Sequence, residues 1–130
     1  MAPGITLNPD PSGDDWAQIT AAVTTIRNAQ RGWLMLEQDT EGVPFNIKQC
    51  VDATNLGFAD IRFGTGALMH SKGFVHAAPM IDLSNSWFTG ISGTNNIGGI
   101  MFGLVPESPP GTVKPACAIL MAGGDSKRVK

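Results

Sequence analysis

Charged residues are scarce in this sequence and tyrosine is absent from it. Lysine and arginine number 9 and aspartate and glutamate 11, which makes 15% of 130 residues and a formal net charge of −2. So little positive charge leaves no basic face, and nucleic-acid binding is therefore not expected. No apolar run approaches the ~20 residues of a membrane-spanning helix, so we expect no membrane contact either.

Cysteine is also rare, because the chain has only Cys50 and Cys117. Neither has a second cysteine within three positions, which is not the spacing of a metal site, and two thiols do not make a disulfide framework. Both stand in apolar surroundings, which favours buried free thiols; a disulfide between them is the alternative. The sequence contains no phosphate-binding loop and no dinucleotide fingerprint. We therefore expect no metal and no cofactor.

Glycine and proline are abundant by contrast, at 16 and 9 residues, while 42% of the chain is hydrophobic. Both residues are unfavourable inside helices, which argues against a helical bundle. The ordinary apolar content and the lack of charge runs argue against disorder. The composition predicts a chain of short strands separated by turns.

One segment is different, since residues 14–31 contain neither glycine nor proline. Apolar residues recur there at helical spacing, with Ser12 or Asp14 placed to cap the start and Gly32 placed for a left-handed C-terminal cap. This pattern predicts one amphipathic helix of about four turns. Its apolar face would consist of Trp16, Ile19, Val23 and Ile26.

The rest of the chain consists of short apolar runs in loops of glycine, asparagine, serine and proline. Residues 1–13 contain three prolines and read as an extended lead-in. Predicted strands near residues 61, 82, 102 and 119 follow one another at intervals of about 20, which is typical of a solenoid. The pattern favours a right-handed parallel β-helix with an N-terminal capping helix over a β-sandwich or jelly roll, whose turn signals are more closely spaced.

Residues 14–23, followed by Gly32–Leu36 and Gly42, resemble the opening of pectin-lyase-like proteins. Residues 59–64 and 80–86 look like early strands of that family. The resemblance implies a right-handed parallel β-helix whose N-terminal opening is covered by the helix. Residues 14–130 would then be the capping helix and the first turns of a β-helix domain that continues beyond this sequence. Such a cover protects core side chains and unpaired backbone groups.

Within that family the proline-rich lead-in, without a signal peptide, looks most like a bacteriophage tailspike or tail-fibre protein. The resemblance implies a trimer, or contact with other virion subunits, and attachment to a host surface polysaccharide. It also implies a location in the virion, or outside the cell after lysis. The leading hypothesis is therefore a structural, host-glycan-binding part of a virion protein, without a complete active site in this segment.

A pair of carboxylates keeps a second hypothesis open, that of a polysaccharide depolymerase, either hydrolase or lyase. Asp60 and Asp82 stand about one predicted turn apart, so they would stack roughly 4.8 Å from each other, as a retaining pair of carboxylates requires. Two solvated strand residues would do the same. Trp33 and Trp87 are the candidate glycan-binding residues, and these two and Phe88 could stack on sugar rings if exposed, although aromatic residues in short strands more often belong to the core. A third hypothesis is a β-sandwich capsid or adhesin subunit.

Overall fold

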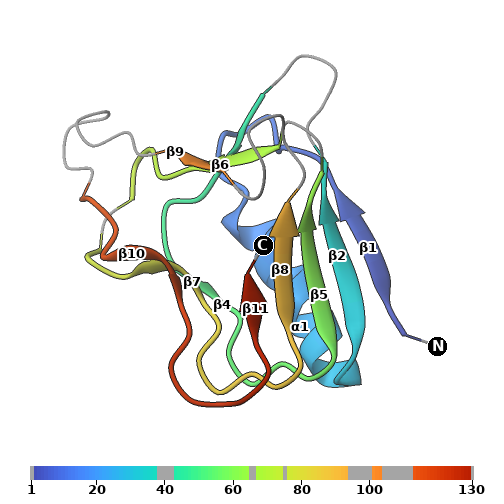
Figure 1. Cartoon of the computed structure of the whole chain (residues 1–130). Helices are drawn as coiled ribbons and strands as arrows, with labels where there is room; N and C mark the ends of the chain where they lie inside the picture. Colours follow the sequence, from blue (N-terminus) through green and yellow to red (C-terminus); the bar gives the residue numbers. More distant parts are fainter. Residues whose placement is uncertain are drawn as a thin grey trace.

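The computed structural model describes residues 2–37, 43–64, 67–74, 76–93, 101–103 and 113–129 of the chain. It is mainly β, with a single helix in these residues, and the strands form parallel sheets (Figure 1). The elements in chain order are β1 (Gly4–Leu7), α1 (Trp16–Ala29), β2 (Gly32–Leu36), β3 (Phe45–Asn46), β4 (Val51–Asp52), β5 (Ala59–Phe63), β6 (Leu68–His70), β7 (Pro79–Asp82), β8 (Gly90–Gly93), β9 (Met101–Gly103), β10 (Cys117–Leu120) and β11 (Arg128–Val129).

The strands belong to three sheets, which the chain visits repeatedly in the same order. Sheet A has the order β1-β2-β5-β8-β11, sheet B the order β3-β6-β9 and sheet C the order β10-β7-β4. Strands β2, β3 and β4 therefore form a first passage through A, B and C, which we call a coil. Strands β5–β7 and β8–β10 form the second and third coils, and β11 returns to sheet A (Figure 1).

The register between coils corrects the predicted period of about 20 residues. Along sheet A, Leu34 pairs with Ile61 and Ile61 with Ile91, which are offsets of 27 and 30 positions. The predicted strands near residues 61, 82, 102 and 119 instead belong to sheets A, C, B and C. The prediction was wrong because short apolar strands of different sheets look alike in sequence.

Strand pairing between the named strands is parallel throughout the part of the chain that the structure describes. This holds for each of the three sheets and for every pair of neighbouring strands in them. A β-sandwich or jelly roll is built from antiparallel hairpins and Greek keys. The parallel pairing is inconsistent with that alternative.

The core lies between the three sheets, where equivalent positions of successive coils carry apolar side chains. Leu34, Ile61 and Ile91 form one such row in sheet A, and Val51 and Ile81 begin another in sheet C. All five are buried. Burying a large aliphatic side chain contributes roughly 1.5–3 kcal/mol, so stacked rows of this kind hold the coils together.

Helix α1 buries the face that its apolar periodicity predicts, through Ile19, Val23 and Ile26 with Ala22 beside them. It packs on β1, β2 and β4, which lie at or next to the N-terminal edges of sheets A and C. Trp16 is partly buried against the same core and donates its indole N–H to the Cys50 carbonyl oxygen at 2.8 Å. In Figure 1 the helix lies behind sheet A. The expected burial of this helix face is confirmed.

The helix ends differently from the prediction, because Gln30 and not Gly32 adopts the left-handed conformation, with φ 55°. The side-chain amide of Gln30 donates to the carbonyl oxygens of Arg27 and Asn55, at 2.8 and 3.1 Å. These two bonds hold a non-glycine residue in a conformation that glycine usually occupies. Gly32 is the first residue of β2 and has φ 145°.

Two polar anchors fix α1 on the coils. The buried carboxylate of Asp15 accepts hydrogen bonds from the backbone N–H of Asn46 at 2.7 Å and of Asp10 at 2.6 Å. At the other end, the Arg27 guanidinium donates to the carbonyl oxygens of Asp52 at 2.6 Å and Thr54 at 2.8 Å. The helix is thereby fastened to sheet B at its start and to sheet C at its end.

The extended lead-in contains a strand that the sequence did not predict, since β1 adds to the edge of sheet A in parallel to β2. Gly4 makes this possible. A Cβ at Gly4 would lie only 2.4 Å from ring atoms of Trp33, so the indole covers a position that has no side chain. Trp33 therefore has a structural role in holding β1.

Candidate functional site

The corner from sheet C to sheet A has the same length in all three coils. Val51 to Ile61, Ile81 to Ile91 and Ile119 to Val129 are each ten positions, and the register aligns them. Two equivalent positions of every corner have positive φ, and the third corner has a further one at Gly124. The first is Asn55, Asn85 or Gly123, and the second is Phe58, Phe88 or Ser126.

This repetition is a sequence signal that periodicity reasoning missed. Residues 52–61 read Asp-Ala-Thr-Asn-Leu-Gly-Phe-Ala-Asp-Ile, and residues 82–91 read Asp-Leu-Ser-Asn-Ser-Trp-Phe-Thr-Gly-Ile. Aspartate, a hydroxyl residue, asparagine, phenylalanine and isoleucine recur at identical offsets, 30 positions apart. Asparagine is the non-glycine residue that best tolerates left-handed backbone conformation, so its recurrence marks equivalent turns.

An exposed aromatic pair lies on this corner. The rings of Phe58 and Phe88 stack with their centroids 4.9 Å apart and an interplanar angle of 10°. Their exposed fractions are 66% and 52%, although large apolar residues are normally buried. Backbone bonds hold the two residues in place, since the Phe58 N–H donates to the Trp87 carbonyl oxygen at 3.1 Å. The pair presents flat apolar rings to solvent at a fixed position.

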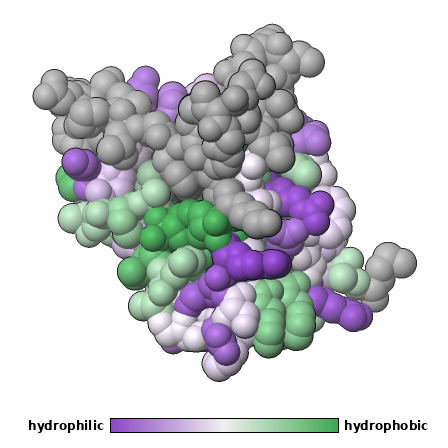
Figure 2. Space-filling model, viewed as in Figure 1, coloured by the Kyte–Doolittle hydropathy of each residue, from purple (hydrophilic) through white to green (hydrophobic). Residues whose placement is uncertain are grey.

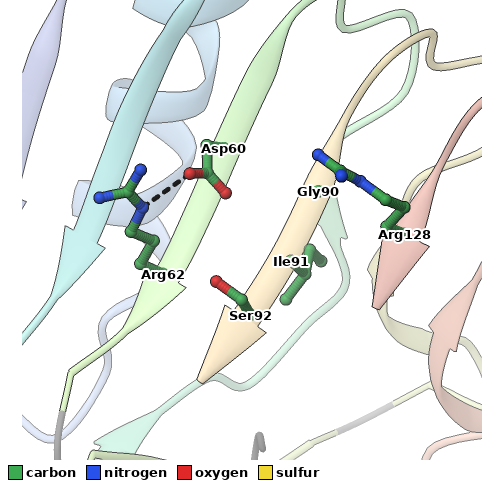
Figure 3. Close-up of a pocket in the computed structure, with 6 residues that line it drawn as sticks. All are labelled: Asp60, Arg62, Gly90, Ile91, Ser92 and Arg128. Carbon is green, nitrogen blue, oxygen red and sulfur yellow. Dashed lines mark hydrogen bonds and ion pairs between the residues drawn. The ribbon is translucent and has the colours of Figure 1, made fainter. Parts of the chain in front are cut away.

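Beside this corner, the outer face of sheet A is hollowed where Gly90 has no side chain. The hollow has a volume of about 240 Å³ and is lined by Asp60, Arg62, Gly90, Ile91, Ser92 and Arg128. Register aligns Asp60, Gly90 and Arg128 in one row across β5, β8 and β11. Figure 3 shows the Arg128 side chain extending over Gly90 toward Asp60, and Ser92 projecting from β8 on the side of Arg62.

Of the two arginines that line this hollow, only Arg62 forms an ion pair with a described carboxylate. The Asp60 carboxylate accepts a hydrogen bond from Nε of Arg62 at 2.6 Å, in an ion pair along one face of β5 (Figure 3). Among the described carboxylates none forms an ion pair with Arg128, which also lines a second hollow of about 440 Å³ with Phe88 and Ser126. Arg128 therefore joins the charged hollow to the aromatic pair.

This combination suits a ligand with both an apolar face and hydroxyl or acidic groups. A flat aromatic ring packs against the C–H face of a sugar ring, while arginine and carboxylate side chains bond its hydroxyl groups. A shallow surface with few fixed polar groups can orient such a ligand without enclosing it. The side chains that make this surface are Phe58, Phe88, Asp60, Arg62, Ser92 and Arg128.

The two tryptophans predicted as stacking residues are exposed, but they lie apart from each other. Trp33 is on β2 in the outer row of sheet A, next to Asp60 in register, and covers Gly4. Trp87 is on the corner directly before Phe88 and forms a bridge between Gly57 and Asp125. Neither tryptophan lines the hollows described above.

The predicted stacking of Asp60 on Asp82 is wrong, because the two residues belong to different sheets. Asp60 is on β5 in sheet A, whereas Asp82 is on β7 in sheet C and pairs with Asp52. The carboxylate neighbour of Asp82 is therefore Asp52, one coil away. The error follows from the period, since residues 22 positions apart were taken to be one coil apart and the spacing at this position is 30.

Both aspartates of that pair serve the turns that follow them. Oδ1 of Asp82 accepts a hydrogen bond from the Ser84 N–H at 2.9 Å. Oδ1 of Asp52 accepts bonds from the Thr54 hydroxyl at 2.6 Å and the Thr54 N–H at 3.0 Å. The Thr54 hydroxyl bond is the largest cause that lowers the pKa of Asp52, and the Thr54 N–H and Arg27 lower it further. A lowered pKa is opposite to what a general acid needs.

The cysteines are free, as favoured, but Cys117 is exposed and Cys50 is partly buried. Burial raises the pKa of Cys50 to about 11, and the nearby Asp82 and Asp52 raise it as well. In the described ranges, no three histidine, cysteine, aspartate or glutamate side chains gather to hold a metal ion. Helix α1 is too short and too polar to cross a membrane.

Comparison of the chain with protein-family models, with curated proteins and with solved structures found no match.

Proposed function

We propose that the three parallel sheets form a right-handed parallel β-helix, with α1 covering its N-terminal end. The support is the cyclic order of sheets A, B and C, which the chain repeats through three coils. Parallel strands of one sheet joined by a crossover connect with right-handed geometry in about 98% of cases, which is the basis for the proposed hand. The pectin-lyase-like resemblance in residues 14–42 points to the same architecture.

On this scaffold, we propose a structural and host-glycan-binding part of a tailspike-like bacteriophage protein. It would act as a homotrimer or with other virion subunits, in the virion or outside the cell after lysis. The observation that carries the binding role is the fixed, exposed Phe58–Phe88 stack beside the hollow of Arg128. Sugar rings would pack on the phenylalanines, and Arg128, Asp60 and Ser92 would bond their hydroxyl or acidic groups.

Affinity electrophoresis through gels that contain bacterial surface polysaccharides tests the binding role. Phe88→Ala removes the ring of the stack that lines a hollow with Arg128, and it is expected to weaken retardation roughly five-fold, as loss of one aromatic contact does. Arg128→Ala should weaken it as well. Val113→Ala and Lys114→Ala are matched controls, since both side chains are exposed and neither lines either of the two hollows described above. Failure of every polysaccharide to retard the protein, or equal loss in the controls, would contradict the proposal.

The depolymerase alternative keeps one structural argument, the adjacency of Asp52 and Asp82. Neighbouring parallel strands are about 4.8 Å apart, close to the ~5–5.5 Å of carboxylates in retaining glycosidases. Their hydrogen bonds to Thr54 and Ser84 favour the structural interpretation. Sizing of polysaccharide after incubation distinguishes the two, because cleavage that Asp82→Asn abolishes would replace the binding proposal by an enzyme.

The proposed trimer has a separate test in light scattering. A mass three times 13.7 kDa is expected for this chain. A monomer at all concentrations would count against self-assembly and would leave the glycan-binding role to be decided by electrophoresis.

A further inference from the structure

A third hollow lies where the loop before α1 meets the residues that follow β3 and β6. It has a volume of about 230 Å³, and its lining consists of Ser12, Gly13, Asn46, Lys48 and Lys72. No carboxylate lines it. No residue of β10 or β11 lines it either, so it is separate from the hydrophobic surface that Figure 2 shows between those two strands in the view of Figure 1.

The two lysines of this hollow occupy equivalent positions of successive coils. The register of sheet B pairs Asn46 with His70, and Lys48 and Lys72 each stand two positions after one of these residues. Both lysine side chains are exposed. Like charges at equivalent positions of neighbouring strands repel each other and destabilise the sheet. An anion held between the two ammonium groups would replace this repulsion by attraction.

No described carboxylate forms an ion pair with either lysine, because the ion pairs in the described part of the chain involve other residues. The acidic residues of the loop before α1 accept hydrogen bonds from backbone N–H groups instead. Asp10 accepts from Ser12 at 2.8 Å and Asp14 from Trp16 at 3.1 Å. The buried Asp15 accepts from the N–H groups of Asn46 and Asp10, as described above.

Hydrogen bonds and packing fix the backbone around both lysines. The Asn46 side chain donates to the Lys72 carbonyl oxygen at 2.8 Å and accepts from the Lys72 N–H at 2.7 Å. It also donates to the Gly13 carbonyl oxygen at 3.0 Å, which fastens the loop to the same place. The stem of Lys48 lies on Gly73, since a Cβ at this glycine would be 3.3 Å from three carbons of that stem. A site built in advance loses less entropy when it binds a ligand.

We propose that this hollow binds a phosphate or sulfate group between Lys48 and Lys72, with the Ser12 hydroxyl as a third donor. That hydroxyl makes only long hydrogen bonds, of 3.3 and 3.4 Å, both with the Asp14 backbone, so it can turn toward a ligand. A phosphate group carries about −1.5 to −2 charges at pH 7, which matches two lysines. The inference is independent of glycan binding, because no residue of this hollow belongs to the surface proposed for glycans.

NMR titration of the 15N-labelled 130-residue protein with inorganic phosphate, and separately with sulfate, at constant ionic strength tests the site. The backbone amide signals of Gly13 and Lys72 should shift and saturate. Lys48→Gln and Lys72→Gln should each weaken binding about five-fold or more, as loss of one charged donor does. Lys114→Gln removes the same charge from an exposed side chain outside the hollow and should leave binding unchanged. No saturable shift at these amides with either anion, or equal weakening by Lys114→Gln, would overturn the proposal.

Thermal unfolding tests the repulsion between the lysines. Phosphate should raise the Tm above its value in chloride of equal ionic strength, because it binds only the folded state. In chloride, Lys72→Gln should be at least as stable as the original protein, since it removes one of two like charges. Phosphate should no longer raise the Tm of this variant. Lower stability of the variant in chloride, or an undiminished rise with phosphate, would overturn the proposal.

Glucose 6-phosphate distinguishes the two sources of such a group. Tighter binding than that of inorganic phosphate, weakened by the same lysine substitutions, would assign the site to a phosphate group carried by a larger molecule. Equal or weaker binding would assign it to the free ion.

Discussion

Phe58 and Phe88 stack ring on ring, although 30 positions separate them in the chain. A stacked pair contributes about 0.5–1.5 kcal/mol beyond burial, and less at an exposed corner. We expect Phe58→Leu and Phe88→Leu to be non-additive, with a coupling of about 0.5 kcal/mol in the free energy of unfolding from a double-mutant cycle in urea. Leucine keeps the backbone conformation comparable. Additivity within about 0.3 kcal/mol would mean that the rings stack without stabilising the fold.

Arg27 is the only charged residue of α1, and we expect it to stabilise the fold. Its guanidinium donates to two backbone carbonyls of the first corner, and hydrogen bonds from charged groups contribute about 1.5–3 kcal/mol. Arg27→Met keeps the aliphatic stem and should lower the free energy of unfolding by about 1–2 kcal/mol. The exposed Arg31→Met is the control and should change it by less than about 0.5 kcal/mol. Similar losses in both variants would refute the anchoring role.

Alanine substitutions at Gly13 and Gly124 distinguish the energetic cost of backbone strain from that of a steric clash. Both have positive φ, at 80° and 74°, but a Cβ at Gly13 meets nothing within 4 Å while one at Gly124 would lie 2.0 Å from the Ser86 carbonyl oxygen. Gly13→Ala should cost about 1 kcal/mol from strain alone. Gly124→Ala should cost about 2 kcal/mol more, because the backbone of residues 123–125 must move away from the coil before it. Equal losses in thermal unfolding would contradict this packing.

His70 should make stability fall in mild acid. Burial lowers the pKa of His70 below its ordinary value, so the folded state binds a proton less readily than the unfolded state. The stabilisation of the neutral form is fully present above the unfolded pKa of ~6.5 and is lost as the pH falls through the folded pKa. We expect His70→Gln to reduce the decline in unfolding free energy between pH 7 and pH 5. At pH 8 the imidazole is neutral in both states, so the difference in unfolding free energy there measures the packing effect of the substitution alone. If His70→Gln leaves the decline between pH 7 and pH 5 unchanged, His70 is not the cause of that decline.

The two cysteines should differ in reactivity. With a pKa of about 11, Cys50 is a thiolate in only about one molecule in a thousand at pH 8, and its side chain is partly buried. Iodoacetamide at pH 8 should therefore alkylate the exposed Cys117 first, with Cys50 modified only on unfolding. Peptide mapping over time measures this order. Rapid modification of Cys50 in the folded protein would show that β4 and its neighbours open readily.

The helix was predictable because its signal is local. Ile19, Val23 and Ile26 lie within two turns, and the same 3.6-residue period that puts them on one face decides which face is buried. Its end was not predictable in this way. The left-handed position at Gln30 depends on a hydrogen bond to Asn55, which is 25 positions away.

The pairing of strands was harder to predict, because an apolar run of four residues does not encode the sheet to which it belongs. The strands at residues 61 and 82 look equivalent, yet they lie in sheets A and C. Strands that do pair in sheet A follow corners with matching turn residues, Asn55 with Asn85 and Phe58 with Phe88, at equivalent left-handed positions. The candidate site was only partly predictable for the same reason. Asp60 can be picked out of the sequence as a carboxylate, but its alignment with Arg128 depends on the strand register, which only the repeated corner residues reveal.

The corner from sheet C to sheet A has a constant length, but the connection from sheet B to sheet C differs in length from coil to coil. From sheet B to sheet C the chain takes six positions between Phe45 and Val51, twelve between Met69 and Ile81, and seventeen between Phe102 and Ile119. The connection from sheet C to sheet A therefore has a fixed length, whereas the connection from sheet B to sheet C accepts insertions without a change of sheet register. Foreign peptides grafted between sheets B and C should be displayed on the folded protein. A single residue added to the corner from sheet C to sheet A would instead shift every inward side chain of the strand that follows.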